Sequence, residues 1–279
     1  MNAFEQGGGR FVVRILGNEF AAEDSGEDGL GNFVNVGFRL LVAFLNLVGD
    51  LKKRFDTADG FRTAEKELQR KVHAALVTVP WGEFLDVYRG IRSRFHARSN
   101  FSRKEILEEL FRHYGHQTDP ALIEQWETDY WKRIEAMTRV FPETEKVLER
   151  LLVEGYRLAM ITNAQGRKTE GKHRLGRYPE LERFFEAIIV AGEGRVPAKP
   201  DPAPFRLCLE KLGIDPHETV YVGDDWRIDV LGSEAVGMHP VWLQHRSVKR
   251  NWPMVETSAP VVHSLEDLAD IERLIKEVK

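Results

Sequence analysis

Three aspartates lie close together where an apolar run of the chain ends and a turn begins. The segment Val220–Val230 reads VYVGDDWRIDV, and its carboxylates are Asp224, Asp225 and Asp229. The apolar residues at its start are typical of a buried strand, and in parallel sheets ligands bind beyond the carboxyl ends of the strands. We therefore expect these three carboxylates to belong to an active site.

Two other segments carry polar residues that could belong to the same site. Thr162 and Asn163 follow an apolar run directly. Lys199 lies in the segment Ala198–Pro202, where two prolines restrict the backbone and Asp201 is suited to cap the next helix. A lysine fixed in this way suggests a role for its charge.

The elements that must position these residues alternate between helix and strand after Pro142. The predicted strands are 157–162, 187–191, 219–223 and 240–243, and the predicted helices are 143–154, 178–185, 202–212 and 228–236. Such alternation predicts an α/β fold, with a parallel sheet that has helices on both faces.

The chain ahead of Pro142 has a different pattern. Apolar residues recur at helical spacing from about Phe61 to Arg139, without a strand signal. The longest apolar stretch, Leu40–Val48, is far shorter than the roughly 20 residues of a membrane-spanning helix, and we interpret it as a buried strand. The first thirty or so residues are rich in glycine and acidic residues, with one strand-like run at Phe11–Leu16.

These patterns predict more than one domain. A chain of 279 residues is long for one compact domain and suits a core with an inserted domain. We expect a loosely held extension over residues 1–35, a core formed by residues 36–58 and 140–279, and an all-helical insertion over residues 59–139. The helical aromatic residues Trp81, Tyr88, Tyr130 and Trp131 are interpreted as core.

Composition and charge limit the expected partners. A net charge of −4, from 40 basic and 44 acidic residues, gives no reason to expect nucleic acid or an anionic membrane, so we expect a small molecule. The single cysteine, Cys208, excludes an internal disulfide and a cysteine-based zinc cluster, and its helical setting predicts a buried, inert thiol. The N-terminal segment lacks the pattern of a secretory signal, so we predict a cytoplasmic protein.

Three segments in this order resemble the motifs of the haloacid dehalogenase superfamily. They are Leu158–Asn163, Lys199–Pro202, and Val222–Asp225 together with Asp229. The resemblance extends from about Leu40 to the C-terminus and includes Pro260–Leu274, which is similar to the last strand and helix of that family. It implies a Rossmann-like core, an inserted helical cap domain, and hydrolysis of the phosphatase type through an aspartate nucleophile.

The segment Val42–Leu51 aligns with the family motif that carries the nucleophile, but its polar residues differ. Asn46 occupies the position of the nucleophilic aspartate, Val48 that of the acid and base, and Asp50 a position where the family usually has threonine. A neutral amide oxygen is a far poorer nucleophile than a carboxylate. Asn46 is therefore not expected to turn over phosphate esters in the manner of the family.

The resemblance also implies roles for the other polar residues. Thr162 and the backbone of Asn163 would bind one phosphate oxygen, and Lys199 would neutralise charge. Asp224 would ligate the metal with support from the other two aspartates, and this oxygen-rich set suits Mg²⁺.

Each residue also has an ordinary structural interpretation. Thr162 can cap a helix, Lys199 can pair with a surface carboxylate, and the aspartates can form a solvated loop at the start of a helix. Their joint occurrence at three sheet edges favours a phosphate and metal site.

The sequence leaves three hypotheses for function. The first is a Mg²⁺-dependent phosphomonoesterase that acts on a small phosphorylated metabolite. The second, favoured by Asn46 and Val48, is an inactive relative that binds a phosphorylated ligand or a protein partner. The third is that residues ahead of Phe61 differ from the natural gene through a reading-frame or start-site error, because the patterning is weaker there.

Two further enzyme classes are alternatives by resemblance. A haloacid dehalogenase generally does without the metal site that Asp224 and Asp229 provide. A phosphonate-cleaving enzyme needs a cap lysine that forms an imine, and the sequence singles out no such lysine.

Overall fold

The structure is a computed structural model that describes residues 11–15, 18–22, 40–43, 57–137, 140–164, 179–248 and 251–271. The chain divides into two compact units between Val36 and Gly37. The first unit contains an antiparallel hairpin of β1 (Phe11–Ile15) and β2 (Asn18–Ala22). β1 confirms the strand-like run, whereas β2 is not expected from the sequence NEFAA, in which phenylalanine is the one strong strand former.

The second unit contains a six-stranded sheet in which every neighbouring pair of strands is parallel. The strand order is β5-β4-β3-β6-β7-β8. The strands are β3 (Leu40–Ala43), β4 (Arg157–Asn163), β5 (Ala187–Ala191), β6 (Thr219–Gly223), β7 (His239–Leu243) and β8 (Val261–Val262). Because the order reverses at β3, strands β4 and β6 flank it although they are far apart in sequence. Ligands bind at such a switch point in open α/β sheets.

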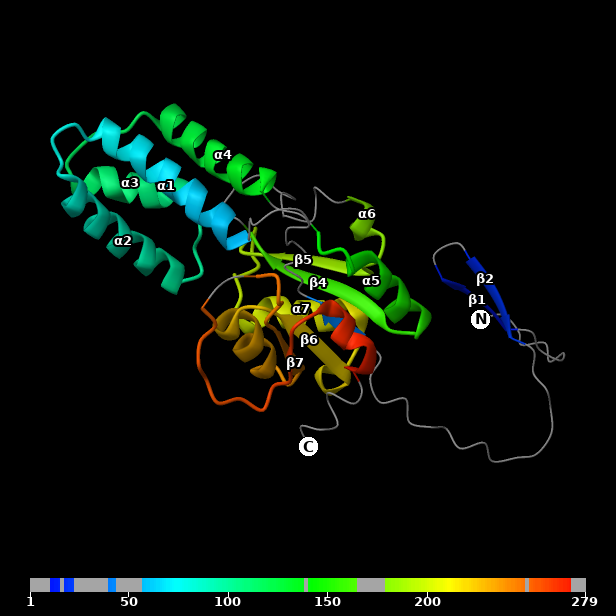
Figure 1. Ribbon diagram of the computed structural model, residues 1–279. Coiled ribbons are helices and arrows are strands. Elements are labelled where there is room, and N and C mark those ends of the chain that lie inside the picture. Colours follow the sequence, from blue (N-terminus) through cyan, green and yellow to red (C-terminus); the bar gives the residue numbers. More distant parts are fainter. Residues whose placement is uncertain are drawn as a thin grey trace, which may run out of the picture. The chain divides into compact units, whose positions relative to one another are not determined.

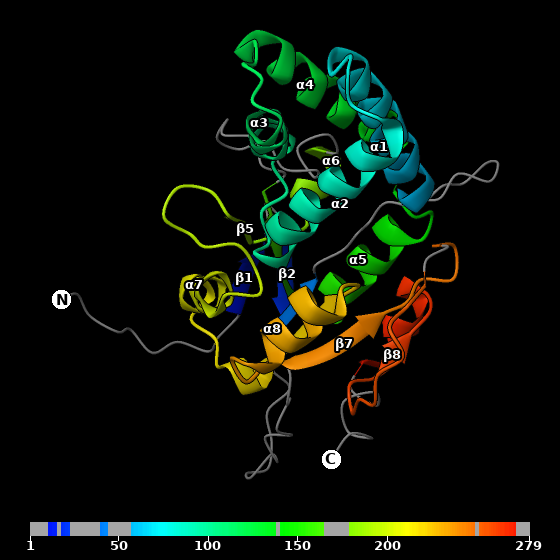
Figure 2. The same cartoon turned by 90° about the vertical axis from the view of Figure 1, so that its left-hand side faces the viewer.

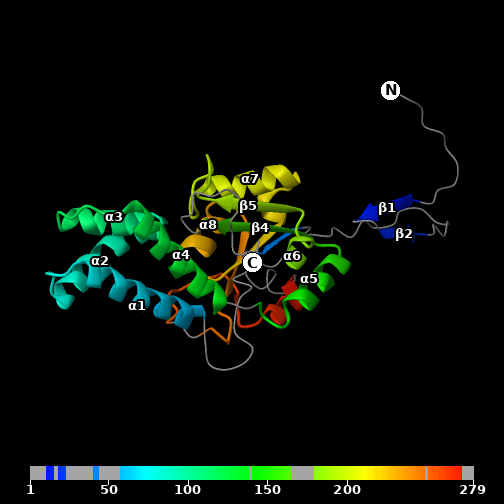
Figure 3. The ribbon, with the colours of Figure 1, turned by 90° about the horizontal axis from the view of Figure 1, so that it is seen from above.

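Alternation along the strands gives the sheet two apolar faces. Leu158 and Met160 of β4 pack on the side of α5 (Thr144–Val153), and Ala159 and Ile161 pack on the side of α7 (Pro202–Leu212). Figure 3 shows these two helices on opposite sides of the strands. The sheet is therefore buried on both faces, as expected for parallel strands between helices.

Cys208 lies on the inner side of α7 and is fully buried. Burial raises the pKa of its thiol to about 12. The thiol stays protonated near neutral pH and is therefore a poor nucleophile, which confirms its interpretation as a buried, inert residue.

The shorter elements depart from the predicted helices in two places. Instead of one helix over 178–185, α6 (Pro179–Glu182) ends early, because Phe184 and Phe185 turn into the core beside α5. Instead of one helix over 228–236, a π-helix (Trp226–Val230) precedes α8 (Leu231–Glu234). Two short 3₁₀ helices, at Pro216–Glu218 and Leu265–Asp270, also belong to the second unit.

Between β3 and β4 the chain forms a helical bundle, the predicted cap (Figures 1 and 2). Its helices are α1 (Thr57–Ala75), α2 (Trp81–Ala97), α3 (Arg103–His113) and α4 (Pro120–Ala136). Tyr88, Tyr130 and Trp131 are buried in its core as expected, whereas Trp81 is 42% exposed. The fold class is confirmed: a Rossmann-like parallel sheet with an inserted helical cap. None of the helices that the structure describes is long and apolar enough to cross a membrane.

Asn46, Val48 and Asp50 all lie outside the described residues.

A buried charged cluster joins the helices of the cap. Glu65 accepts hydrogen bonds from Arg92 at 2.8 Å and from Arg103 at 3.2 Å. Arg103 also donates to the hydroxyl of Tyr130 at 2.6 Å, and its guanidinium lies 3.2 Å from Nε2 of His96. Burial, together with the positive charge of Arg103, lowers the pKa of His96 to about 4. The folded cap therefore holds this imidazole in its neutral form near pH 7.

The lowered pKa of His96 predicts a pH dependence of stability. A histidine in the unfolded chain titrates near 6.5, so between about pH 6.5 and pH 4 the unfolded state binds a proton that the folded state excludes. The contribution of His96 to stability is full above pH 6.5 and is lost as the pH falls toward 4. We expect His96→Gln to reduce this loss in urea denaturation at a series of pH values. An identical pH dependence in both proteins would contradict the assignment.

Gly232 of α8 is predicted to be required by packing. A Cβ atom at this position would lie 2.9 Å from Cζ of Phe205 and 3.4 Å from Cα of Pro200. Phe205 is fully buried, so its ring cannot move aside, and Gly232→Ala should lower the free energy of unfolding by about 1–3 kcal/mol. Gly90→Ala in α2 is the control, because its Cβ meets only the end of a flexible side chain at 4.0 Å. Chemical denaturation should show no loss there, and equal losses would refute the packing argument.

Candidate functional site

The ends of β4 and β6 reach the same edge of the sheet. In the register of the strands, Val42 pairs with Ala159 of β4, and Ala43 pairs with Val222 of β6. Continued along both strands, this register puts Thr162 and Asp224 at the same level, two positions beyond Ala43. The structure therefore brings together two of the predicted groups, which are about 60 residues apart in sequence.

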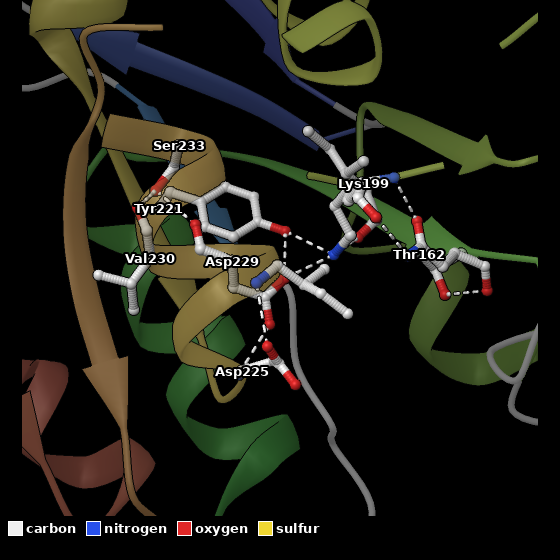
Figure 4. A network of polar contacts seen from close by, with 10 residues as sticks. Thr162, Lys199, Tyr221, Asp225, Asp229, Val230 and Ser233 are labelled. Carbon is white, nitrogen blue, oxygen red and sulfur yellow. Dashed lines mark hydrogen bonds and ion pairs between the residues drawn. The ribbon is translucent and has the colours of Figure 1, made fainter. Parts of the chain in front are cut away.

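Lys199 carries a buried charge at this edge. Its side chain is 1% exposed, and Nζ donates to the carbonyl oxygen of Ile161 at 3.1 Å. Nζ also donates to the hydroxyl of Tyr221 at 2.9 Å and to the carboxylate of Asp229 at 2.7 Å (Figure 4). Burial lowers the pKa of Lys199, and the negative charge of Asp229 opposes that shift. The ammonium is thus held by a counter-charge and two neutral acceptors.

Asp229 is as buried as Lys199, and both of its carboxylate oxygens accept hydrogen bonds. One oxygen accepts from Lys199 and, at 3.3 Å, from the hydroxyl of Tyr221. The other accepts from the backbone N–H of Asp225 at 3.0 Å. Gly223 allows this close packing, because a Cβ atom there would lie 2.3 Å from Cβ of Asp229. In this structure Asp229 is the counter-ion of the lysine.

The side chain of Asn163 holds the backbone of Lys199. Its amide oxygen accepts the N–H of Lys199 at 2.8 Å, and its amide nitrogen donates to the carbonyl of Lys199 at 3.1 Å. The hydroxyl of Thr162 makes one long contact, at 3.4 Å, with the carbonyl oxygen of Asn163. A role of the Asn163 backbone toward phosphate stays a prediction, and the structure adds a side-chain role that links the end of β4 to the loop before α7.

The three predicted metal ligands differ in their surroundings. Asp225 caps the π-helix, since its carboxylate accepts the N–H of Ile228 at 2.9 Å, and the backbone carbonyl of Asp224 accepts the indole N–H of Trp242 at 3.2 Å. Among the described residues, no three or more histidine, cysteine, aspartate or glutamate side chains are grouped to hold a metal ion. The carboxylates of Asp224 and Asp225 are of the type that Mg²⁺ prefers. Asp229 fits poorly, because its oxygens are already engaged.

Tyr221 belongs to the site although sequence reasoning does not single it out. Burial raises the pKa of its hydroxyl well above the usual range, and the charge of Asp229 adds to this rise. The signal lies in the alternation of β6. Val220 and Val222 face the α5 side of the sheet, so Tyr221 between them faces the α7 side, toward Ile161.

Arg227 connects the acidic turn with the cap. It donates to the carbonyl oxygen of His96 at 3.3 Å, and its guanidinium lies 3.5 Å from the hydroxyl of Ser99. Ser99, in the turn after α2, has a φ of 54°, which lies in the left-handed region. Arg227, which lies between the predicted ligands Asp225 and Asp229, thus contacts α2 of the cap.

Comparison with known proteins identifies the family of the chain. A family model described as haloacid dehalogenase-like hydrolase matches residues 34–237, well over half of the chain. The chain belongs to the haloacid dehalogenase-like hydrolase family. The matched region includes Thr162, Lys199 and the turn that carries Asp224, so the resemblance drawn from the three motifs is confirmed.

Two phosphatases are among the relatives of the chain. A glyceraldehyde 3-phosphate phosphatase from Pyrococcus abyssi is 36% identical over 110 residues, which are 39% of this chain and 44% of that protein. A phosphoglycolate phosphatase from Mannheimia succiniciproducens is 27% identical over 158 residues, which are 55% of this chain and 65% of that protein. The chain thus matches less than two thirds of the length of each of these relatives.

A solved structure shows the same fold. The crystal structure of a 2-haloacid dehalogenase from Pseudomonas syringae pv. Tomato DC3000 matches the chain with a TM-score of 0.55 and 23% sequence identity. The similarity covers 85% of this chain and 98% of that chain, and it concerns the fold alone.

The buried pair of Lys199 and Asp229 predicts unequal effects of substitution at two nearby aspartates of the chain. Asp229→Asn removes the carboxylate that lies 2.7 Å from the buried ammonium of Lys199, and removal of one partner of such a pair costs about 3–5 kcal/mol. Asp225→Asn keeps a side chain that caps a helix equally well, so a change below about 1 kcal/mol is expected. Urea denaturation measures both variants. Similar losses in the two would show that Asp229 is not the counter-ion.

Proposed function

We propose that this chain is a phosphatase-type hydrolase that binds a small phosphorylated molecule at the carboxyl end of its sheet. One observation carries the proposal, namely the buried ammonium of Lys199 beside the end of β4, on the edge that also carries Asp224. A positive charge in a region of low dielectric interacts with a phosphate dianion far more strongly than an exposed one does. The names of the two relatives support the same class of reaction.

In this proposal, each residue of the site has a different role in phosphate binding. The hydroxyl of Thr162 donates to one phosphate oxygen, and Lys199 neutralises part of the negative charge. Asp229 keeps the lysine protonated in its buried place, and Asn163 keeps its backbone fixed. Such fixed charges and donors stabilise a phosphoryl group in transfer without reorganisation at the moment of reaction.

Mg²⁺ is the cofactor that we propose. Asp224 would hold it with support from Asp225, because Mg²⁺ binds through one or two carboxylates together with phosphate oxygens. When bound, the ion supplies positive charge to the phosphoryl oxygens. We leave Asp229 out of the ligand set, because its oxygens accept hydrogen bonds from Lys199 and from the backbone of Asp225.

Binding without turnover is the second candidate function, and the sequence of the first motif favours it. Asn46 has a neutral amide where the family has its nucleophilic carboxylate, and Val48 has no proton to exchange. A chain of this kind would retain a phosphate site through Lys199 and Thr162 and lack the group that attacks phosphorus. A phosphorylated ligand or a protein partner would then be bound and released unchanged.

Hydrolysis of a generic aryl phosphate in the presence of Mg²⁺ separates the two candidates. We expect little turnover by the unaltered chain and a rate increase of at least about 100-fold in Asn46→Asp, because loss of a nucleophile costs enzymes far more than this. Asp224→Ala, combined with Asn46→Asp, should abolish the gain.

The other outcomes are also decisive. Turnover by the unaltered chain that depends on Asp224 would refute the role given to Asn46, and Asp50 would be the next carboxylate to replace. Absence of turnover in Asn46→Asp would contradict the phosphatase assignment itself.

A further inference from the structure

Tyr221 has a hydroxyl that packing alone does not explain. The residue is fully buried in β6, and its ring packs edge-on against Phe205 with the ring centroids 5.2 Å apart. A phenylalanine would fill the same space and make the same ring contact. A buried hydroxyl is costly unless it is hydrogen-bonded, so its presence here calls for a specific partner.

The hydroxyl lies between two opposite charges. It accepts a hydrogen bond from Nζ of Lys199 at 2.9 Å and donates one to the carboxylate of Asp229 at 3.3 Å (Figure 4). A neutral hydroxyl is both donor and acceptor, so it satisfies an ammonium on one side and a carboxylate on the other. The three groups form one buried network in which each touches the other two.

The network fixes the end of a side chain that is otherwise flexible. Asn163 fixes the backbone of Lys199, but four rotatable bonds separate that backbone from Nζ. Ile161, Tyr221 and Asp229 fix the ammonium from three directions, at 3.1, 2.9 and 2.7 Å. Without the hydroxyl of Tyr221, two of these three acceptors remain, and the position of the ammonium is less restricted.

We propose that Tyr221 is a positioning residue, whose hydroxyl holds the ammonium of Lys199 in the place from which its charge reaches bound phosphate. This inference rests on the proposed function of the site. Tyr221 does not touch the phosphate in this scheme and acts through the lysine. The alternative is that the hydroxyl of Tyr221 forms hydrogen bonds with Lys199 and Asp229 that stabilise the fold and have no effect on phosphate binding.

Tyr221→Phe, compared with Tyr130→Phe, distinguishes the two views. Tyr130 is a matched control, because its hydroxyl is also buried and also accepts from a cation, Arg103, at 2.6 Å in the cap. Both variants should lose stability in thermal unfolding. Calorimetric titration with inorganic phosphate in the presence of Mg²⁺ should show about tenfold weaker binding for Tyr221→Phe, the size expected for a hydrogen bond to a charged group. Tyr130→Phe should bind phosphate as the unaltered chain does.

A second measurement detects the environment of the Lys199 ammonium in the absence of phosphate. Hydrogen-bonded, buried ammonium groups exchange slowly with water, so ¹⁵N-edited NMR should show a lysine side-chain signal that Lys199→Met removes. Tyr221→Phe should shift this signal or broaden it by faster exchange, and Tyr130→Phe should leave it unchanged.

The outcomes keep this inference separate from the proposed function. An unchanged ammonium signal and unchanged phosphate affinity in Tyr221→Phe would overturn the positioning role. If the unaltered chain binds no inorganic phosphate, the proposed function fails, and the NMR comparison alone decides whether Tyr221 positions Lys199.

Discussion

The ion pair between Lys199 and Asp229 is the interaction on which the rest of the site depends. The charged atoms lie 2.7 Å apart, and both side chains are 1% exposed. Because burial of either charge alone is strongly unfavourable, the loop before α7 and the turn after β6 must be positioned together. Asn163 ties that loop to β4, and Gly223 lets the turn approach its own strand closely. One electrostatic constraint thus joins three segments that are distant in sequence.

The topology of the sheet makes this constraint useful for function. Strands β4 and β6 flank β3, so the carboxyl ends of β4 and β6 lie on either side of the end of β3. A buried positive charge at that edge suits a phosphate, and the turn with Asp224 adds carboxylates of the kind that Mg²⁺ prefers. Arg227 extends the same turn to the cap through the carbonyl of His96. The proposed metal ligands, the counter-ion of Lys199 and the contact with the cap therefore all lie within residues 224–229.

Much of the fold can be predicted from sequence because its signals are local. Strands 157–163, 187–191 and 219–223 are found where apolar runs end at polar residues, and α7 begins at Pro202 behind the capping Asp201. The predictions fail where distant packing outweighs local preference. Phe184 and Phe185 leave the helical pattern to enter the core, and the segment after Asp225 winds as a π-helix, with Asp225 capping it and Asp229 drawn onto Lys199.

The sequence by itself determined the order of the motifs, the residue types of the site and the family to which they point, because spacing and chemistry are properties of a linear chain. The prediction that Asn46 occupies the position of the family's nucleophilic aspartate also comes from the sequence alone. Only the tertiary structure decided that Asp229 is the counter-ion of Lys199 and that the side chain of Asn163 forms hydrogen bonds with the backbone of Lys199. It also decided that the hydroxyl of Tyr221 accepts a hydrogen bond from Lys199. The physical reason is that hydrogen-bond partners are set by distance and burial after folding, and strand pairing brings together residues that the sequence keeps apart.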